Sequence, residues 1–385
     1  MAATPDPVAF QIQESGDGPE RKAMQRREDP LILVVNPGST STRVAVFRGD
    51  APEEKASLPA PGPGREGGLW GELEPRLQGI LAWLDEEGVD QRELEAVVGR
   101  GGLLRPLEGG TYPVTDAMLA DAREGRRGSH ASNLGCALAR ALAEGVGAGT
   151  GSGVPSFVVD PVSTDEFGEL ARYSGLREIR RASLSHALSI HALVREVCQE
   201  EGREVEGSRF VVGHLGGGIS ICPVVDGRIV DANNANSGGP FSPTRAGGLP
   251  TQELLDLAFS GEYGADEMKA MTVKKGGLTS YLGTSDAREV ERMIDDGDVE
   301  ARRVYQAMAY QIAKEIGSMA TVLKGAAERI LLTGGLAESD LLMGWVMERV
   351  DFLAPVEIRS GIGEMKALAL GALGCLLGDL EAKEY

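Results

Sequence analysis

Side chains suited to binding an anion gather in a turn near the start of the chain. Residues 31–35 are apolar and read as a buried strand, and residues 44–47 resume with mostly apolar positions. The intervening N-P-G-S-T-S segment offers the side chains of Asn36, Ser39 and Ser41 together with backbone N–H groups. Several N–H and O–H donors that converge on one point suit a phosphate. An ordinary hairpin turn uses the same residue types, so this turn alone leaves both interpretations open.

A second copy of this pattern favours the phosphate interpretation. Residues 210–228 again run from an apolar strand through a glycine-rich turn into another apolar strand. The glycines of that turn are Gly216, Gly217 and Gly218. Two similar hairpins far apart in one chain indicate a duplicated domain with a phosphate between the halves.

A third glycine turn also follows a predicted strand. Gly334 and Gly335 come directly after a predicted strand that ends at Thr333, and we expect a helix to begin near Ser339. Because the N-terminus of a helix favours negative charge, this turn suits the remainder of a nucleotide.

Composition and charge narrow the class of protein. A length of 385 residues predicts two domains, and 42% apolar residues allow a substantial core. The net charge of −19 argues against non-specific binding to nucleic acid or to an anionic membrane. The four cysteines lack C-x-x-C spacing, which favours reduced thiols in a cytoplasmic protein. Neither a secretory signal nor an apolar run of the ~20 residues that a membrane helix needs is visible.

Strands that alternate with helices predict an α/β fold and place two candidate residues at strand ends. We expect a strand at residues 96–99 to deliver Arg100 into a glycine loop. A strand at residues 156–160 ends in Asp160, and α/β folds place metal and phosphate chemistry at the carboxyl ends of strands.

Two later segments carry further candidates. A helix over residues 183–200 contains His186, and the long polar loop of residues 233–248 contains Arg245. Arg100 and Arg245 could each form an ordinary surface ion pair, but their placement in glycine loops after strands favours a functional role for both. For His186, both a structural role and a contact with the phosphoryl group remain open. Two segments rich in Pro or Gly are expected to be loops: residues 50–68 and 145–153.

The pattern predicts two domains preceded by a disordered tail. We expect the last helix to pack back on the first domain. The expected parts are residues 1–29 for the tail, residues 30–160 with 366–385 for domain I, and residues 161–365 for domain II.

The motifs together resemble the acetate kinase family, within the actin–hexokinase–Hsp70 superfamily. The resemblance covers about residues 31–378. Its motifs are N-P-G-S-T-S-T, G-R-G-G-L-L, S-H-A-S-N-L-G, V-D-P-V-S-T-D-E-F, H-L-G-G-G-I-S and P-T-R-A-G-G-L-P. It implies duplicated actin-like (ribonuclease H-like) ATPase domains, with mixed sheets flanked by helices and the active site in the cleft between the domains. It also implies ATP or ADP and Mg²⁺ as cofactors, and a homo-oligomer of two or more chains.

The resemblance assigns roles residue by residue. Arg245 would contact the transferred phosphoryl group with His186 as a partial match, Arg100 and His130 would face the carboxylic acid or acyl phosphate, and Glu364, Asp160 and Asn36 would be linked to magnesium. The nucleotide and its phosphates would be held by Asn36, Ser39, Ser41, His214, Gly216, Gly217, Gly218, Gly334, Gly335 and Leu336.

Two departures from the acetate kinase pattern bear on the acceptor. The family has two histidines four residues apart where this chain has Ala182 and His186, and the acidic run after its catalytic arginine is replaced here by residues 246–250. Both departures favour butyrate over acetate. Propionate and branched-chain acids remain alternatives.

The implied reaction needs no general base, because a carboxylic acid of pKa ~4–5 is already ionised at neutral pH. The protein must instead align two anions and neutralise charge on the phosphoryl oxygens, for which Arg is well suited. A sugar kinase would need a base, and Asp160 could serve. A non-catalytic nucleotide switch of the actin or chaperone type is a further alternative, although little sequence lies beyond the two ATP-binding halves.

Overall fold

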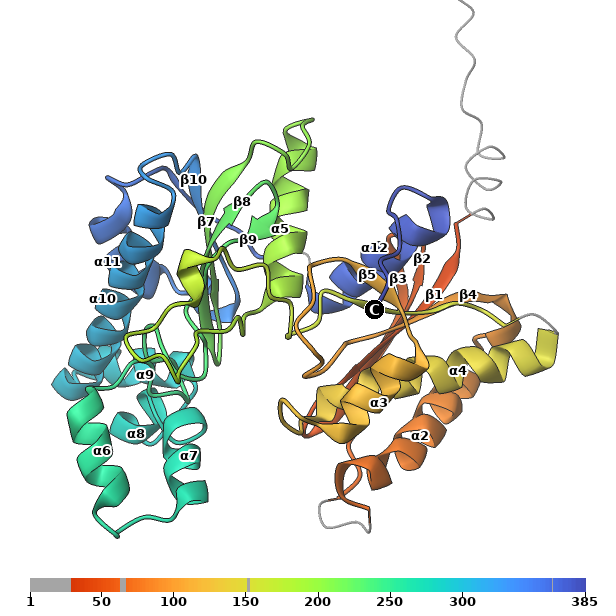
Figure 1. The fold of residues 1–385 in the computed structure, drawn as a ribbon, viewed down its shortest axis with the longest axis horizontal. Helices are drawn as coiled ribbons and strands as arrows, with labels where there is room; N and C mark the ends of the chain where they lie inside the picture. The colour runs from red at the N-terminus through yellow and green to blue at the C-terminus, as the bar shows by residue number, and fades with distance from the viewer. Residues whose placement is uncertain (1–28, 63–66, 151–152, 362) are drawn as a thin grey trace, which may run out of the picture.

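The computed structural model describes residues 29–62, 67–150, 153–361 and 363–385. Figure 1 shows two lobes, each with a β-sheet and helices packed against it. Each sheet mixes parallel and antiparallel strands, which confirms the predicted α/β fold of duplicated sheets flanked by helices. Apart from Asp29, the tail predicted for residues 1–29 lies outside the described residues.

The first sheet has the strand order β3-β2-β1-β4-β6-β5. Its central strand β1 is buried throughout because both faces of the sheet are covered. Leu31, Leu33 and Val35 pack toward α2 and α4, whereas Ile32 and Val34 pack toward α12. The elements are β1 (Leu31–Pro37), β2 (Ser41–Arg48), β3 (Ala51–Pro59), β4 (Leu94–Gly99), β5 (Thr111–Pro113), β6 (Ser156–Val159), α2 (Leu73–Glu86), α3 (Asp116–Glu124), α4 (Leu134–Thr150) and α12 (Glu364–Leu377).

The second sheet has the order β11-β10-β7-β8-β9. Alternate residues of β7 again face opposite layers: Val211 packs toward α10 and α11, and Val212 packs toward α5. The elements are β7 (Arg209–Leu215), β8 (Ile219–Val225), β9 (Arg228–Ile229), β10 (Arg329–Thr333), β11 (Val356–Ile358), α5 (Ala187–Glu200), α6 (Thr251–Phe259), α7 (Ala265–Val273), α8 (Leu278–Leu282), α9 (Ala287–Asp295), α10 (Val299–Val322) and α11 (Asp340–Val350).

The two sheets repeat one local arrangement. The hairpin β1–β2 has β4 parallel to its first strand, and the hairpin β7–β8 has β10 parallel to its first strand. In both lobes a glycine turn therefore lies beside the carboxyl end of a neighbouring parallel strand.

Helix α5 belongs to the cores of both lobes. Leu188 and Ala192 pack with α12 against the first sheet, whereas Ile190 and Leu193 pack against the second. Figure 1 shows α5 on the side of the second lobe that faces the first. The N-terminus of α5 and the residues before it are thereby held between the lobes.

Two loop predictions are wrong in part. The segment predicted as a loop at residues 50–68 contains β3, an edge strand whose charged and largely exposed residues lack the apolar alternation of a core strand. Helix α4 continues to Thr150, past the loop expected from residue 145, because glycine costs a helix only about 1 kcal/mol and tertiary packing can supply that. Helix α5 begins at Ala187, later than predicted.

Candidate active site

A buried arginine stabilises the first glycine turn through hydrogen bonds. Within the turn the Gly38 N–H donates to the Ser41 carbonyl at 2.8 Å. Arg76 of α2 donates to Thr42 Oγ1 at 2.6 Å and to the Gly38 carbonyl at 3.0 Å, and it pairs with Glu72. Ser39 remains exposed at the tip of the turn. The sequence analysis did not single out Arg76, although an arginine beside Leu77 and Ile80 on an apolar helix face could have been a signal.

The second glycine turn is held by the long loop of residues 233–248. The hydroxyls of Ser242 and Thr244 donate to the Gly217 carbonyl at 2.6 and 3.3 Å. The Arg245 guanidinium lies against Gly218, where an added Cβ would be 2.5 Å from Arg245 Cζ. It donates to the Ala235 carbonyl at 3.0 Å. Burial lowers the pKa of Arg245, but a guanidinium stays charged at neutral pH.

The ends of β1 and β4 meet the start of α12 at one carboxylate. Glu364 accepts hydrogen bonds from Asn36 Nδ2 at 3.1 Å and from Arg43, and it pairs with Arg100 Nη1 at 2.7 Å. The Arg100 N–H bonds the Val35 carbonyl, which fixes the loop after β4 beside β1. Burial would raise the pKa of Glu364, but Arg100 and Arg43 outweigh it and lower this pKa. The carboxylate is therefore ionised.

Arg43 is a further residue of this cluster that the sequence analysis did not name. It lies opposite Asn36 in the β1–β2 register, so both side chains can reach Glu364. Its place in S-T-R, directly after the hydroxyl-rich turn, was the available signal.

Two histidines stack between the lobes. The rings of His186 and His214 lie 4.1 Å apart at 16°, and His186 Nδ1 is 2.9 Å from Ser220 Oγ. Burial and the charge of Arg100 lower the pKa of His214 to about 4, against the opposing effect of Glu364. Burial, His214 and the two arginines Arg245 and Arg100 hold the pKa of His186 well below its usual value. Both rings are neutral at neutral pH, and His214 Nδ1 is buried without a hydrogen-bond partner among the described residues.

His130 caps the short helix η3 (Ala131–Asn133) by accepting the Ser132 N–H at 3.2 Å. Partial burial and the charges of Arg100, Arg245 and Lys274 lower its pKa. His130 therefore lies within electrostatic range of both predicted catalytic arginines. Lys274, which follows α7, adds a positive group that the sequence analysis did not name.

The third glycine turn adjoins the second. Thr333 of β10 pairs with His214 of β7, and Gly334 follows with φ +94°. A Cβ on Gly334 would lie 2.4 Å from the Leu215 carbonyl oxygen, so glycine permits this close approach. Gly335 and Leu336 open η5 (Gly335–Glu338), and Ser339 caps α11, so this helix begins where it was predicted.

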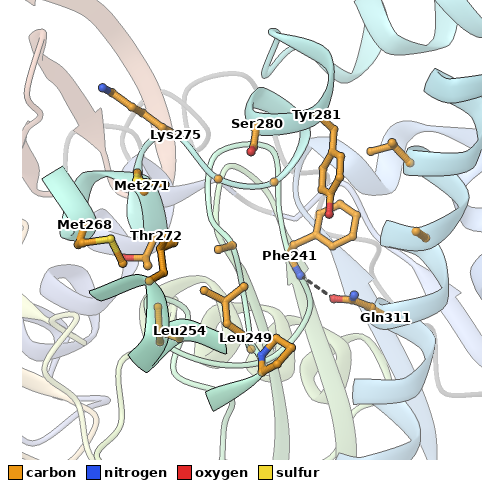
Figure 2. A pocket seen from close by; sticks show the side chains of 18 of the residues that line it. Phe241, Leu249, Leu254, Met268, Met271, Thr272, Lys275, Ser280, Tyr281 and Gln311 are labelled. Atoms are coloured by element: carbon orange, nitrogen blue, oxygen red, sulfur yellow. Dashed lines mark hydrogen bonds between the residues drawn. The ribbon is translucent and has the colours of Figure 1, made fainter. Parts of the chain in front are cut away.

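A cavity of about 580 Å³ lies in the second lobe among α6, α7, α8, α10 and the loop that carries Arg245. Figure 2 shows its largely apolar lining, which includes Phe241, Leu254 and Met271. None of the predicted site residues lines this cavity. The cavity and the predicted site share a loop but are separate.

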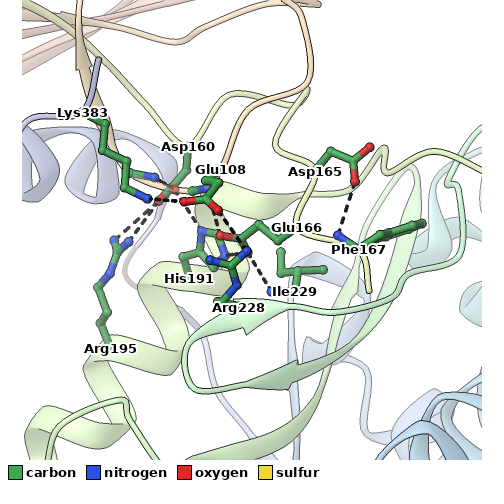
Figure 3. Close-up of polar contacts among 12 residues, drawn as sticks. Glu108, Asp160, Asp165, Glu166, Phe167, His191, Arg195, Arg228, Ile229 and Lys383 are labelled. Carbon is green, nitrogen blue, oxygen red and sulfur yellow. Dashed lines mark hydrogen bonds and ion pairs between the residues drawn. The ribbon is translucent and has the colours of Figure 1, made fainter. Parts of the chain in front are cut away.

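The Asp160 carboxylate is bonded to groups that the sequence analysis did not assign to the site (Figure 3). It accepts the Gly110 N–H at 2.7 Å, lies 2.9 Å from His191 Nδ1 and contacts Arg195 at 3.4 Å. Burial would raise the pKa of Asp160, but His191 and Arg195 outweigh it and bring this pKa to about 2. Asp160 still lines a small cavity with Arg100, His186 and Glu364.

The oxygen groups near Glu364 fit a magnesium ion better than a metal that requires a full protein cage. Among the described residues, no group of three or more His, Cys, Asp or Glu side chains is arranged to hold a metal. Mg²⁺ keeps several waters and phosphate oxygens and needs only one or two carboxylates. Glu364 supplies one ionised carboxylate beside Asn36, and in this structure that carboxylate is paired with Arg100 and Arg43.

The structure brings predicted residues together in three groups. Asn36 and Arg100 both contact Glu364, Arg245 lies against the second turn, and His186 stacks on His214. Arg100, Asp160, His186 and Glu364 line one small cavity. The Asp160 carboxylate faces the buried His191 of α5, to which the sequence analysis assigned no role. The chemical roles of all these residues remain predictions.

Comparison with known proteins agrees with this architecture. The acetokinase family model matches residues 172–357. "Probable butyrate kinase 2" of Caldanaerobacter subterraneus subsp. tengcongensis is 45% identical over 361 residues, which cover 92% of this chain and 99% of that protein. Acetate kinase of Porphyromonas gingivalis superposes with a TM-score of 0.73 at 18% identity, covering 90% of this chain and 100% of that one. A propionate kinase of Francisella tularensis superposes with a TM-score of 0.69 at 17% identity, covering 89% of this chain and 98% of that one.

Proposed function

The chain belongs to the acetokinase family, and from that premise we propose that it transfers the γ-phosphoryl group of ATP to the carboxylate of butyrate, reversibly. The proposal rests on kinship with a protein named as a butyrate kinase across nearly its whole length. The observation in this chain that supports it best is the cluster in which Arg100 and Asn36 meet Glu364.

Positive charge rather than a base would drive the reaction. The acceptor carboxylate is ionised at neutral pH and can attack the γ-phosphorus directly. Arg100 would orient the carboxylate, with His130 nearby, and Arg245 would bind the phosphoryl oxygens through its forked guanidinium. The neutral ring of His214, whose Nδ1 has no described partner, can donate a hydrogen bond to an anion without adding charge.

The glycine turns would hold the nucleotide. Ser39 and Ser41 in the first turn, and Gly216, Gly217 and Gly218 in the second, would bind phosphate oxygens, and Gly334 to Leu336 would lie at the adenosine. Glu364 and Asn36 would hold Mg²⁺, which when bound neutralises charge on the phosphate oxygens.

A sugar kinase is less well supported, because its hydroxyl acceptor requires a general base. Asp160 was the candidate, but its carboxylate is paired with His191 and its pKa is about 2, which makes it a weak base. The engagement of Asp160 therefore favours an acceptor that is already ionised.

We also propose that the chain forms a cytoplasmic homo-oligomer, with domain I at residues 30–160 and 366–385 and domain II at 161–365. Among the described residues no helix is long and apolar enough to cross a membrane. Light scattering on the purified full chain will test the oligomeric state, and a mass equal to one chain would contradict it.

The reaction can be tested by trapping acyl phosphate. Purified protein is incubated with ATP, Mg²⁺ and each straight or branched acid of about two to six carbons, and hydroxylamine converts any acyl phosphate to hydroxamate. We expect the highest rate with butyrate. Hydroxamate from acetate alone would contradict the proposed acceptor, and none from any acid would contradict the carboxylate kinase.

A matched pair of arginine variants links this activity to the site. Arg245→Gln should lower kcat by about 100-fold or more, because a donor to the developing charge is lost. Arg126→Gln removes an arginine whose side chain is 77% exposed, and it should leave kcat unchanged.

A further inference from the structure

The chain crosses from the first lobe to the second through a cluster of buried charges (Figure 3). His191 of α5 is 3% exposed, Asp160 at the end of β6 is 2% exposed, and Glu166 in the crossing segment is 8% exposed. His191 Nδ1 lies 2.9 Å from Asp160 Oδ1, and His191 Nε2 lies 3.1 Å from Glu166 Oε2. One imidazole ring therefore bridges two buried carboxylates.

The same carboxylates hold backbone of both lobes. Asp160 Oδ1 accepts the Gly110 N–H at 2.7 Å, and Glu166 Oε1 accepts the Gly109 N–H at 2.9 Å, at the start of β5. Glu166 Oε2 accepts the Ile229 N–H of β9 in the second lobe at 2.8 Å. The ring links these anchors, so its loss would free segments of both lobes together.

Packing leaves the ring little freedom. A Cβ on Gly109 would lie 2.4 Å from His191 Cε1, so the backbone approaches the ring edge closely. Asp160 itself has φ +38°, a conformation that an L-residue adopts at a cost of about 1–3 kcal/mol and retains only when its surroundings enforce it. The bonds to Gly110 and His191 supply that constraint.

The cluster borders the candidate active site through Asp160. Asp160 lines a small cavity together with Arg100, His186 and Glu364. His186 is the N-cap residue of α5, the helix that carries His191 about one and a half turns later. A displacement of the His191 ring would therefore be transmitted both through Asp160 and along α5.

We propose that His191 is a positioning residue for the phosphoryl transfer, which fixes Asp160 and ties the two lobes together at the crossing between them. The inference rests on the proposed function for its catalytic consequence. Its structural part, that one ring holds Gly109, Gly110 and Ile229 through two carboxylates, stands independently.

Charge supports this role. Each ring nitrogen faces a carboxylate oxygen, so both must donate for both contacts to be hydrogen bonds. Burial lowers the pKa of a histidine, but Asp160 and Glu166 outweigh it and raise the pKa of His191 to about 9. Removing one member of a buried cluster of one cation and two anions is strongly destabilising, because it leaves a buried charge unpaired.

A nearby surface ion cluster provides the control. Glu108 pairs with Arg228 at 3.1 Å and with Lys383 at 3.4 Å, and all three side chains are 41–55% exposed. These contacts also join segments near the crossing, but solvent screens them. Arg228→Gln should leave kcat within about twofold of the wild type.

The test compares His191→Gln with this control in the full-length protein. Glutamine has one amide donor group and cannot bond both carboxylates as the ring does. We expect kcat to fall by about 10- to 100-fold, as for small misplacements of reacting groups, with KM for ATP nearly unchanged. Hydrogen exchange should accelerate at Gly109, Gly110 and Ile229. Wild-type kcat or wild-type exchange in folded His191→Gln would overturn the proposal.

A second variant decides the matter if His191→Gln does not fold. Glu166→Gln retains the His191–Asp160 contact but removes one anion. Faster exchange at Gly109 and Ile229 with a lower kcat would support the proposal, and wild-type values of both would overturn it. If the wild-type protein forms no hydroxamate with any acid, the proposed function fails, and the exchange data alone then decide whether His191 ties the lobes.

Discussion

Gly218 shows how one missing side chain sets the position of a charged group. The Arg245 guanidinium occupies space that a Cβ at Gly218 would enter, and it donates a hydrogen bond to the Ala235 carbonyl. Because Gly218 has no positive φ, its role is space rather than backbone conformation.

Gly218→Ala should therefore displace Arg245 and lower kcat by about 10- to 100-fold while the protein remains folded. Gly217→Ala adds the same methyl group where no atom lies within 4 Å, and its kcat should stay well above that of Gly218→Ala. Steady-state kinetics and thermal unfolding of both variants provide the measurement. Equal kcat values would contradict the packing argument.

The neutral histidine pair predicts how stability depends on pH. The pKa of His214 is about 4 in the folded chain, lowered mainly by burial, against about 6.5 in an unfolded chain. Below about pH 6.5 the unfolded chain binds a proton that the folded chain refuses. His214 thus lowers the free energy of unfolding as the pH falls from about 6.5 toward 4.

At about pH 5 this effect amounts to on the order of 2 kcal/mol relative to pH 7. His214→Asn, which cannot titrate, should lose less stability than the wild type over that interval. Denaturant unfolding at several pH values measures the difference. Parallel pH profiles for the two proteins would show that the His214 ring does not resist protonation.

At the scale of elements, α4 holds the Arg100 loop by close backbone contact. A Cβ on Gly135, in the first turn of α4, would lie 1.9 Å from the Arg100 carbonyl oxygen. A Cβ on Gly99, at the end of β4, would lie 2.1 Å from the Gly135 carbonyl oxygen. Two glycines facing each other thus let the helix meet the strand end and set the direction of Arg100.

Gly135→Ala should cost about 1–3 kcal/mol of unfolding free energy and lower kcat, because the helix must move away from the Arg100 loop. Gly145→Ala is the matched control in the same helix, since its methyl group would meet no atom within 4 Å. We expect that control to be neutral or to gain up to about 1 kcal/mol from helix propensity. Urea unfolding of both variants checks this, and equal stabilities would contradict it.

At the scale of the whole molecule, the last helix of the chain packs against the sheet formed by its first strands. Helix α12, near the end of the sequence, covers the first sheet and places Glu364 beside Asn36 and Arg100. Helix α5 packs on both lobes, so the candidate active site adjoins an element that depends on both sheets.

Leu368→Ala should therefore lower the free energy of unfolding of the first lobe by about 2–5 kcal/mol, since Leu368 is fully buried against the first sheet. Leu377→Ala removes a leucine of the same helix that is 59% exposed and should change it by less than about 0.5 kcal/mol. Thermal and denaturant unfolding compare them. Similar losses would mean that α12 does not depend on this contact.

Local signals were sufficient for much of the fold and for the identity of the candidate residues. The apolar runs of β1 and β7, the glycine turns after them, and the start of α11 near Ser339 involve residues that are neighbours in sequence. Such interactions are set by residue type and spacing, so the sequence predicts them. The α/β class, the duplicated halves and the family motifs all follow from this kind of information.

Only the tertiary structure decided which charged groups meet. Glu364 and Arg100 form an ion pair although they are far apart in the chain. Arg76 bonds the Gly38 carbonyl of the first turn, and the Asp160 carboxylate contacts His191. The strand β3 likewise forms because its backbone pairs with β2, and its own residues do not alternate between apolar and polar side chains. Partner choice between distant segments depends on how the sheets and helices pack, and no local spacing encodes that geometry.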